Sequence, residues 1–263
     1  MELRNIRGLT GADVTVYDIT GCLPGRHLGL PSPSATLVID LADGLVLGSQ
    51  SRPTTETFRC CLAGMHLRPV TIHHDGTQRG VQLDLDPRTV RTLFGVPAAE
   101  LANDSVELSQ VDHAVADELY HRLADAAPSA RARVAADVLA RAADPSDAPV
   151  DAHEAWRLLA RSRGRMRIAE LVDRSGWSPR RLTALFVAEF GIGPKQAARL
   201  MRFDAARRGL EAGRAAGEVA AACGYADQPH MSREFAELTG HAPGSLIRHR
   251  ASEFVPDSEH RVA

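Results

Sequence analysis

Long apolar runs are missing from this sequence, although 44% of its 263 residues are hydrophobic. A candidate membrane helix needs at least about 18 consecutive apolar residues, and no stretch approaches that length. The first residues, MELRNIRGLTGAD, also lack the apolar segment of a secretory signal. We therefore expect a cytoplasmic protein with no membrane partner.

Cysteine and lysine are both scarce. The four cysteines (Cys22, Cys60, Cys61 and Cys223) follow no disulfide-framework spacing, so we expect them to stay reduced. Only one of the 31 basic residues is a lysine, Lys195. This excess of arginine favours a GC-rich coding sequence over a chemical demand for guanidinium groups.

Signatures of catalysis and metal binding are also lacking. The sequence contains no nucleophile elbow, phosphate-binding loop or triad-like pattern. His66, His73 and His74 raise the question of a metal, but neighbouring strand residues point to opposite faces and no H-x-H spacing occurs. The Cys60-Cys61 pair lacks the C-x-x-C spacing of zinc and redox sites. We predict no enzyme activity, no metal and no cofactor.

Charge is distributed unevenly, although the formal net charge is only −2. Residues 154–250 contain 17 basic and 10 acidic side chains, whereas the remainder contains 14 basic and 23 acidic ones. A basic block beside an acidic remainder points to a polyanionic partner for the block alone. On charge alone, an ordinary solvated surface explains the arginines equally well.

Composition divides the chain into two domains of different class, an α+β arrangement. Residues 143–152, ADPSDAPVDA, have no apolar period, which indicates a linker. We expect a β-rich N-terminal domain with a helical tail in residues 1–142. An all-α domain should occupy residues 153–250, and residues 251–263 read as a disordered tail.

Within the N-terminal domain, residues 14–85 read as short strands: VTVYDI, ATLVIDL, LVLGS, RPVTIHH and GVQLDL. Asp43-Gly44 and Asp75-Gly76 are hairpin-type turn signals between two pairs of these segments.

Residues 87–142 turn helical. Asp86 is expected to cap a helix with Pro87 at its first position, and its apolar face should contain Val90, Leu93 and Phe94. Two alanine-rich helices, ADELYHRLADAA and RARVAADVLARAA, follow.

An internal repeat marks the C-terminal domain. Residues 168–194 read IAELVDRSGWSPRRLTALFVAEFGIGP, and residues 216–243 read AGEVAAACGYADQPHMSREFAELTGHAP. A Gly-aromatic pair recurs at an offset of 48 residues, and four later positions recur at 49: Leu182, Phe186, Gly191 and Pro194 match Met231, Phe235, Gly240 and Pro243. A turn can absorb the difference of one residue. Each copy therefore predicts a short helix, a Gly-centred turn and a second helix.

The first copy obeys the rules for such a unit. Gly176 ends the leading helix, where a left-handed residue is needed, and Trp177 covers the joint between the helices. Ser178 is a suitable N-cap, and Pro179 fits the first helical position. The residues expected to face inward are Ile168, Leu171, Val172, Leu182, Leu185 and Phe186.

The second copy follows the same pattern. Gly224 closes its leading helix, Tyr225 covers the joint and Asp227 caps the second helix. Pro229 then lies in the first turn, where its missing N–H costs little. The residues expected to face inward are Val219, Ala220, Cys223, Met231, Phe235 and Leu238.

With these motifs, residues 153–250 resemble the two-helix-turn-helix DNA-binding domain of the AraC/XylS family of bacterial transcription regulators. GYADQPHMSREFAELTGHAPGSL is close to the family signature, and SPRRLTALFVAEFGIGPKQAARLMRF resembles the first motif with the long helix that joins the two. The resemblance implies that one chain places two recognition helices in adjacent major-groove segments, about 34 Å apart on one DNA face.

The resemblance also implies which residues contact DNA. Those carried over as base-facing are Arg180, Thr183 and Ala184 in the first copy, and Gln228, His230 and Arg233 in the second. Those carried over as phosphate contacts are Arg181, Lys195, Arg199, Ser232 and Arg248. Arginine can bond guanine in bidentate fashion, and glutamine suits adenine. Ala184 is shorter than the polar residue usual at its position, so the first copy reads bases weakly or through a thymine methyl.

The N-terminal segments PSPSATLVIDLADG and VQLDLDPRTVRTLFGVPAAELANDSVELSQV resemble a module that precedes this DNA-binding domain in other AraC-type regulators. Such modules are generally treated as effector-sensing, oligomerising or both. The resemblance implies double-stranded DNA as partner, a small-molecule effector and a homodimer, with RNA polymerase as a further partner if the protein is an activator. Activation and repression both remain open.

Two other functions remain as alternatives. A DNA-binding domain fused to a repair module would use Cys60 or Cys61 to accept a methyl group from alkylated DNA, as in proteins of adaptive-response type. An interaction protein that has lost DNA binding is the other. Protection of DNA near its own gene would argue against the latter.

Overall fold

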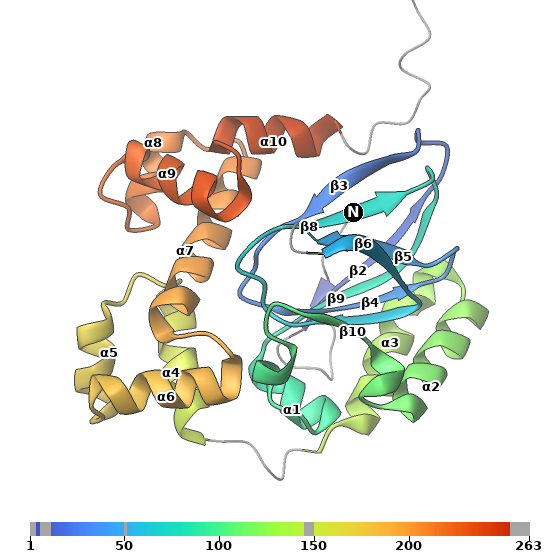
Figure 1. Ribbon diagram of the computed structural model, residues 1–263, viewed down its shortest axis with the longest axis horizontal. Helices are drawn as coiled ribbons and strands as arrows, with labels where there is room; N and C mark the ends of the chain where they lie inside the picture. Colours follow the sequence, from blue (N-terminus) through green and yellow to red (C-terminus); the bar gives the residue numbers. More distant parts are fainter. Residues whose placement is uncertain (1–3, 6–11, 50–51, 145–149, 253–263) are drawn as a thin grey trace, which may run out of the picture.

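A computed structural model of the protein describes residues 4–5, 12–49, 52–144 and 150–252. The N-terminal domain contains two β-sheets with helices on one side, and the C-terminal domain is entirely helical over the described residues (Figure 1). This confirms the predicted α+β class, with a β-rich body and helical tail followed by an all-α domain.

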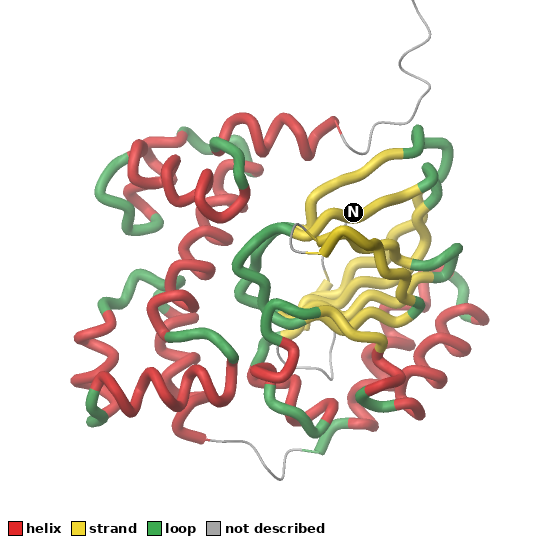
Figure 2. The backbone as a smooth tube through the Cα atoms, viewed as in Figure 1, coloured by secondary structure: helices red, strands yellow, loops and turns green. Residues whose placement is uncertain are grey.

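The larger sheet has six strands in the order β1-β2-β9-β4-β7-β10, and its neighbouring strands are all antiparallel. The strands are β1 (Arg4–Asn5), β2 (Ala12–Ile19), β4 (Ala35–Asp40), β7 (Cys60–Ala63), β9 (Gln78–Leu85) and β10 (Ser105–Glu107). The second sheet has four strands in the order β3-β8-β5-β6, again antiparallel. They are β3 (Gly25–Gly29), β5 (Leu45–Ser49), β6 (Arg52–Phe58) and β8 (Val70–His74). Figure 2 shows the two sheets as stacked yellow layers.

The two faces of the six-stranded sheet differ because successive strand residues alternate between faces. One face is apolar and packs against the helical tail in a buried cluster that includes Leu37, Leu83 and Leu119. The tail comprises α1 (Arg88–Phe94), η1 (Ala98–Leu101), η2 (Leu108–Gln110), α2 (His113–Asp125) and α3 (Pro128–Ala142). The opposite face, which carries most of the polar residues, faces the four-stranded sheet.

The start of α1 differs by one residue from the expectation. Pro87 precedes the first helical residue, Arg88, whose backbone N–H donates to Asp86 Oδ1 at 3.0 Å. The N-cap is therefore Pro87, which offers no side-chain cap, and the expected cap Asp86 accepts the Arg88 N–H from one residue further out. The predicted apolar face is buried, namely Val90, Leu93 and Phe94.

The two predicted hairpins are wrong, although both turns exist. Gly44 and Gly76 have φ values of +103° and +106°, as glycine turns require. However, each turn joins strands of different sheets: β4 pairs with β7 and β9, whereas β5 pairs with β6 and β8. Likewise, β8 and β9 do not pair with each other. The turns carry the chain between layers, and the strand partners are distant in sequence.

The C-terminal domain consists of seven helices among the residues described: α4 (Val150–Arg161), α5 (Ile168–Ser175), α6 (Pro179–Phe190), α7 (Pro194–Glu211), α8 (Ala216–Ala222), α9 (Gln228–Thr239) and α10 (Pro243–Ser252). Helix α4 begins inside the segment 143–152 that was expected to be a linker, of which residues 145–149 lie outside the described residues. Of the expected tail, residues 251–252 end α10, and the rest also lies outside them.

Aromatic rings fill the C-terminal core. The Trp156 ring lies 4.6 Å from that of Phe190, and the Phe203 ring lies 4.7 Å from that of Phe235, measured between centroids. Met65, from the loop after β7, belongs to the same buried cluster. The two domains therefore share part of one core. No helix within the described ranges is long and apolar enough to cross a membrane.

Candidate nucleic-acid interface and interdomain cavity

The first helix-turn-helix is built as its sequence predicts. Gly176 ends α5 with φ +68°, and its N–H donates to the Val172 carbonyl at 3.1 Å. Ser178 Oγ accepts the Arg181 N–H at 3.3 Å and so caps α6. Of the residues expected to face inward, three are buried (Leu171, Leu182 and Phe186) and three are partly buried (Ile168, Val172 and Leu185). Trp177, which was expected to cover the joint, is also partly buried.

The second helix-turn-helix repeats this construction. Gly224 has φ +78°, and Tyr225 is buried over the joint. Asp227 Oδ1 accepts the His230 N–H at 2.7 Å, which places Pro229 in the first turn of α9. All six residues expected to face inward are buried: Val219, Ala220, Cys223, Met231, Phe235 and Leu238.

The residues expected to face DNA bases lie on the outer surfaces of α6 and α9. Five are exposed: Arg180, Thr183, Ala184, Gln228 and Arg233. His230 is half-buried; its Nδ1 accepts the Ala226 N–H at 3.3 Å, which leaves Nε2 as the outward donor in the neutral ring. The Thr183 hydroxyl donates to the Pro179 carbonyl at 2.9 Å, so its methyl group and a hydroxyl lone pair remain for a ligand.

The expected phosphate contacts divide into two groups. Arg181, Lys195 and Arg248 are exposed, and Ser232 is half-buried. Arg199 is different, because its guanidinium pairs with Glu234 at 3.2 Å and also with Glu237. In this structure, Arg199 therefore joins α7 to α9.

Glu234 is the centre of a buried network in the second copy. It accepts the Tyr225 hydroxyl at 2.8 Å and pairs with Arg202 at 3.4 Å, in addition to Arg199. Burial and the Glu234 carboxylate raise the pKa of Tyr225, so its hydroxyl stays protonated and remains a donor. The network fixes α9 on α7, and no local sequence pattern predicts it because Arg199 and Glu234 are far apart in sequence.

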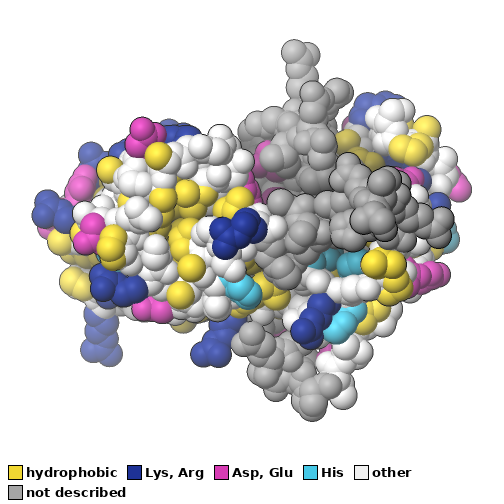
Figure 3. All heavy atoms as spheres, turned by 90° about the horizontal axis from the view of Figure 1, so that it is seen from above, with side chains coloured by type: hydrophobic (Ala, Val, Ile, Leu, Met, Phe, Trp, Pro, Cys, Tyr) yellow, Lys and Arg dark blue, Asp and Glu magenta, His cyan; other side chains and the backbone are white. Residues whose placement is uncertain are grey.

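Val187 is a surface residue that was not among the expected DNA contacts. It is 47% exposed and is one of the two exposed large hydrophobic residues of the described chain. It lies seven residues after Arg180, so the outer stripe of α6 continues from Arg180 through Ala184 to Val187. The spacing alone could have revealed this. Seen from above, most of the visible Lys and Arg side chains surround the C-terminal part of the molecule, at the left (Figure 3).

The C-terminal end of α6 is fixed to the N-terminal domain. Glu189 is 4% exposed and accepts hydrogen bonds from Arg91 of α1, at 2.7 Å, and from His153 Nε2 of α4, at 3.1 Å. Beside it, Gly191 lies so close to Ala99 and Ala102 that a Cβ atom there would come within 2.2 Å of the Ala102 Cβ. The first helix-turn-helix thus docks on the N-terminal domain through a buried ion pair and a close backbone contact.

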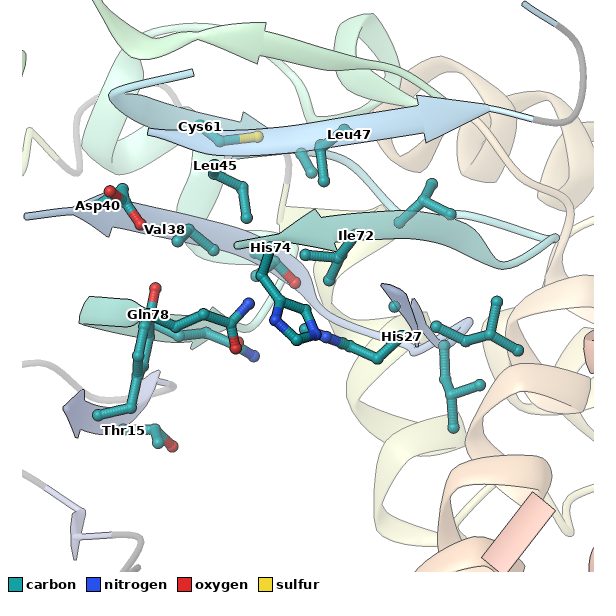
Figure 4. Close-up of a pocket in the computed structure, with 18 of the residues that line it drawn as sticks. Thr15, His27, Val38, Asp40, Leu45, Leu47, Cys61, Ile72, His74 and Gln78 are labelled. Atoms are coloured by element: carbon teal, nitrogen blue, oxygen red, sulfur yellow. The ribbon is translucent and has the colours of Figure 1, made fainter. Parts of the chain in front are cut away.

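A cavity of about 1200 Å³ lies between the two sheets. Thr15, Val38, Asp40, Cys61 and Gln78 line it from the six-stranded sheet (Figure 4). Leu45, Leu47, Ile72, His27 and His74 line it from the four-stranded sheet. One wall is therefore largely polar and the other mainly apolar, as expected of a site for an amphiphilic small molecule.

Helix α7 lines the same cavity with four charged residues: Asp204, Arg207, Arg208 and Glu211. Arg207 donates to Asp204 at 2.7 Å and to Glu211 at 2.6 Å, and Arg208 also pairs with Asp204. The helix that joins the two helix-turn-helix units therefore contributes part of the wall of the N-terminal cavity. Nothing in the local sequence pattern of α7 predicted this.

The paired cysteines have the electrostatics of core residues. Burial raises the pKa values of Cys60 and Cys61 to about 12, and Glu107 adds to the effect at both. Both thiols are therefore protonated at neutral pH, whereas the thiolate is the nucleophile. Among the described residues, no group of three or more His, Cys, Asp or Glu side chains has an arrangement that could hold a metal ion.

Comparisons with known proteins agree with this geometry. Residues 171–249 match a helix-turn-helix domain family. The HTH-type transcriptional regulator Rv1931c of Mycobacterium tuberculosis is 37% identical over 84 residues, and the match covers 32% of each chain. The chain thus matches about a third of the length of this curated relative.

Over the whole chain, the fold is similar to that of ToxT from Vibrio cholerae. One ToxT crystal structure gives a TM-score of 0.53 at 13% identity, covering 90% of this chain and 97% of ToxT. ToxT bound to an unsaturated fatty acid gives a TM-score of 0.54 at 13% identity, covering 92% and 97%. At this identity, the similarity shows a shared fold. The duplicated helix-turn-helix and the sequence matches to it agree with the resemblance of residues 153–250 to the DNA-binding domain of the AraC/XylS family of transcription regulators.

Proposed function

We propose that this protein is a sequence-specific transcription regulator that binds double-stranded DNA through α6 and α9. A small molecule in the cavity between the sheets modulates this binding. One observation carries the proposal: α7 joins the two DNA-reading units and also lines the cavity. Because one rigid helix contacts both regions, a ligand that moves α7 changes the position of the recognition helices.

On DNA, the first copy reads bases with Arg180, Thr183, Ala184 and Val187. Arg180 suits guanine O6 and N7, whereas Ala184 and Val187 suit the thymine methyl group. Their exposure on one stripe of α6 supports this assignment.

The second copy reads bases with Gln228, His230 and Arg233. Gln228 suits adenine and Arg233 suits guanine, and His230 offers its Nε2–H. Arg181, Lys195, Ser232 and Arg248 contact phosphates, which positions the protein without reading sequence. Arg199, originally expected among the phosphate contacts, acts by holding α9 on α7, as its two glutamate partners indicate.

The effector role rests on the cavity and on the relatives of the fold. ToxT, which shares the fold, has been solved with an unsaturated fatty acid and with a naphthyl-substituted butenoic acid. In the present chain, a small molecule between the sheets would contact α7 directly. We further propose that the protein works in the bacterial cytoplasm as a homodimer and contacts RNA polymerase if it is an activator.

The repair alternative receives no support from the cysteines. Cys60 and Cys61 are buried, and the pKa of each is raised to about 12, which disfavours a methyl-accepting thiolate. Methyl transfer from alkylated DNA to either residue would overturn this conclusion. The second alternative, an interaction protein without DNA binding, is addressed by the experiment below.

Selection of bound sequences from a random pool of double-stranded DNA tests the proposed function. The full-length protein should enrich a site with two conserved segments about 10 base pairs apart, one for each recognition helix. An Arg180→Ala, Arg233→Ala double variant should lose the enrichment. Arg133→Ala, which removes an exposed charge from α3, is the control. A pool without enriched sequences, for the wild-type protein with and without cell extract, would favour the interaction protein.

A further inference from the structure

The polar wall of the cavity contains two aspartates placed directly opposite each other. Asp13 of β2 is the cross-strand partner of Asp84 of β9, and Asp84 is in turn opposite Thr36 of β4. Thr36 is opposite Ala63, and Ala63 is opposite Ser105. All five residues line the cavity. The sheet register therefore places these five side chains in one row across five neighbouring strands. The two charged residues of the row, Asp13 and Asp84, are both acidic and lie next to each other.

This pairing of two aspartates is electrostatically unfavourable. Like charges on directly opposite strand residues destabilise a sheet. Burial raises the pKa of Asp84, and the neighbouring charge of Asp13 raises it further. The Gln82 amide donates to Asp84 Oδ1 at 3.0 Å, which only partly offsets the cost. The pair thus lies in a position where a positive charge would be stabilised.

Helix α7 supplies positive charge nearby, and its arginines are shared among several carboxylates. The Arg207 charge lowers the pKa of Asp84, and the Asp13 charge contributes to the raised pKa of Arg208. Both arginines are also paired with Asp204, and Arg207 is paired with Glu211. Among the residues that the structure describes, Asp13 and Asp84 therefore share these two guanidinium groups with Asp204 and Glu211.

The opposite wall supplies apolar surface. Leu45, Leu47 and Ile72 of the four-stranded sheet point into the cavity (Figure 4). Deeper in, Val38 and Cys61 belong to a buried cluster with Phe58, against which Leu45 and Leu47 pack. A ligand that satisfies both walls therefore has an apolar body and a positively charged head.

We propose that the effector is an amphiphilic cation, an amine with an apolar body, whose ammonium group binds between Asp13 and Asp84. This inference rests on the proposed effector function and specifies its ligand class. The ammonium group competes with Arg207 and Arg208 for the two aspartates, and so weakens the attraction between the six-stranded sheet and α7. Ligand binding is thereby coupled to the helix that joins the two DNA-reading units.

Three probes that share one apolar body test this: phenylbutylamine, phenylbutanol and phenylbutanoate. Their binding to the full-length protein is measured by isothermal titration calorimetry at neutral pH. The amine should bind most tightly, the alcohol about tenfold more weakly because it lacks a charge-assisted hydrogen bond, and the carboxylate most weakly. Asp84→Asn should remove the advantage of the amine over the alcohol. Asp18→Asn, an exposed residue on the opposite face of β2, should leave it unchanged.

Asp13→Asn provides a second test if Asp84→Asn does not fold, and it should have the same effect. Tightest binding by phenylbutanoate would overturn the ligand class while leaving the cavity as an effector site. An amine advantage that survives both substitutions would overturn the assignment to Asp13 and Asp84. Absence of binding by all three probes would overturn the inference, while the DNA selection described above would still test the regulator function separately.

Discussion

The first helix-turn-helix copy is tied to the N-terminal domain, whereas the ion pairs of the second copy run to the joining helix α7. Glu189 of α6 pairs with Arg91 of α1, and Glu234 of α9 pairs with Arg199 and Arg202 of α7. Each recognition helix thus has a buried glutamate, but the two carboxylates connect different parts of the molecule. The two copies therefore share one backbone pattern but are attached by ion pairs to different parts of the molecule.

This difference assigns different roles to the copies. The α6 attachment connects the first recognition helix directly to the N-terminal domain. The outer stripe of α6 ends in Ala184 and Val187, whereas α9 presents Gln228 and Arg233. We infer that the second copy supplies more of the hydrogen-bonded base recognition and that the first copy is the one more directly exposed to regulation.

The largest expected effect comes from the two glycines that end the recognition helices. Gly191→Ala and Gly240→Ala both place alanine at a positive φ, which costs about 1–2 kcal/mol. A Cβ at Gly191 would also meet Ala102, whereas nothing lies within 4 Å of one at Gly240. Overpacking adds about 1–3 kcal/mol, so Gly191→Ala should be clearly the more destabilising in urea unfolding. Equal losses would mean that the α6 docking contact does not exist in solution.

The two buried glutamates should differ next. Arg91→Ala leaves Glu189 with His153 alone, and removal of one partner of a buried pair costs about 3 kcal/mol. Arg199→Ala leaves Glu234 with Arg202 and the Tyr225 hydroxyl, so we expect a loss of about 1 kcal/mol. Unfolding free energies from urea titrations compare the two. A larger loss for Arg199→Ala would reverse the comparison.

The apolar stripe of α6 predicts a smaller effect on DNA binding. If Val187 contacts a thymine methyl, replacing that thymine by deoxyuridine should cost about 1 kcal/mol of binding free energy. In Val187→Ala, the same replacement should cost much less. Ala236→Gly, at the equivalent position of α9, is the control. Fluorescence anisotropy measures the binding of each protein to the thymine and deoxyuridine forms of the selected site. If deoxyuridine weakens binding as much for Val187→Ala as for the wild-type protein, Val187 does not contact the methyl group.

The smallest effect concerns the cavity. Because the pKa of Asp84 is raised in the folded protein, the native state retains its proton more readily than the unfolded chain does. The contribution of this carboxyl group to the stability of the fold therefore decreases as the pH rises through its native pKa. Removing a cross-strand like-charge pair is worth about 0.2–1 kcal/mol, so Asp84→Asn should raise the Tm at neutral pH by about 1–3 °C.

The advantage of Asp84→Asn should disappear at acid pH, where the aspartate is protonated in both states. Thermal unfolding at several pH values, with Asp18→Asn as the control, shows the trend. A lower Tm for Asp84→Asn at neutral pH would indicate that Arg207 already compensates the aspartate fully.

Sequence predicted the parts of the molecule that local rules determine. Capping rules correctly place two glycines after helices (Gly176 and Gly224) and two polar caps before helices (Ser178 and Asp227). They succeed because each of these residues acts on backbone groups within a few positions. The hairpins were wrong for the complementary reason. A glycine turn such as Gly76 specifies a reversal of the chain, but not which strands pair after it.

The missing parts of the site depend on contacts between distant residues. Arg91 and Glu189 are 98 positions apart, and Arg199 and Glu234 are 35 apart. The sequence of α7 does not show which of its arginines are exposed and which are paired with an acidic residue of another helix. Alternation places Asp13 and Thr15 on one face of β2, but the expected strand began only at Val14. The sheet order was needed to show that this face lines a cavity with α7.

The central claim, that each recognition helix reads its own segment of the operator, is tested most directly by binding measurements on half-site variants. Arg180→Ala and Arg233→Ala are each measured against the selected site and against sites with one segment randomised. Each substitution should weaken binding to the intact site by about 1–3 kcal/mol. It should cause no further loss of binding when the segment read by the substituted helix is randomised. An equal loss on specific and random DNA for both variants would contradict the claim.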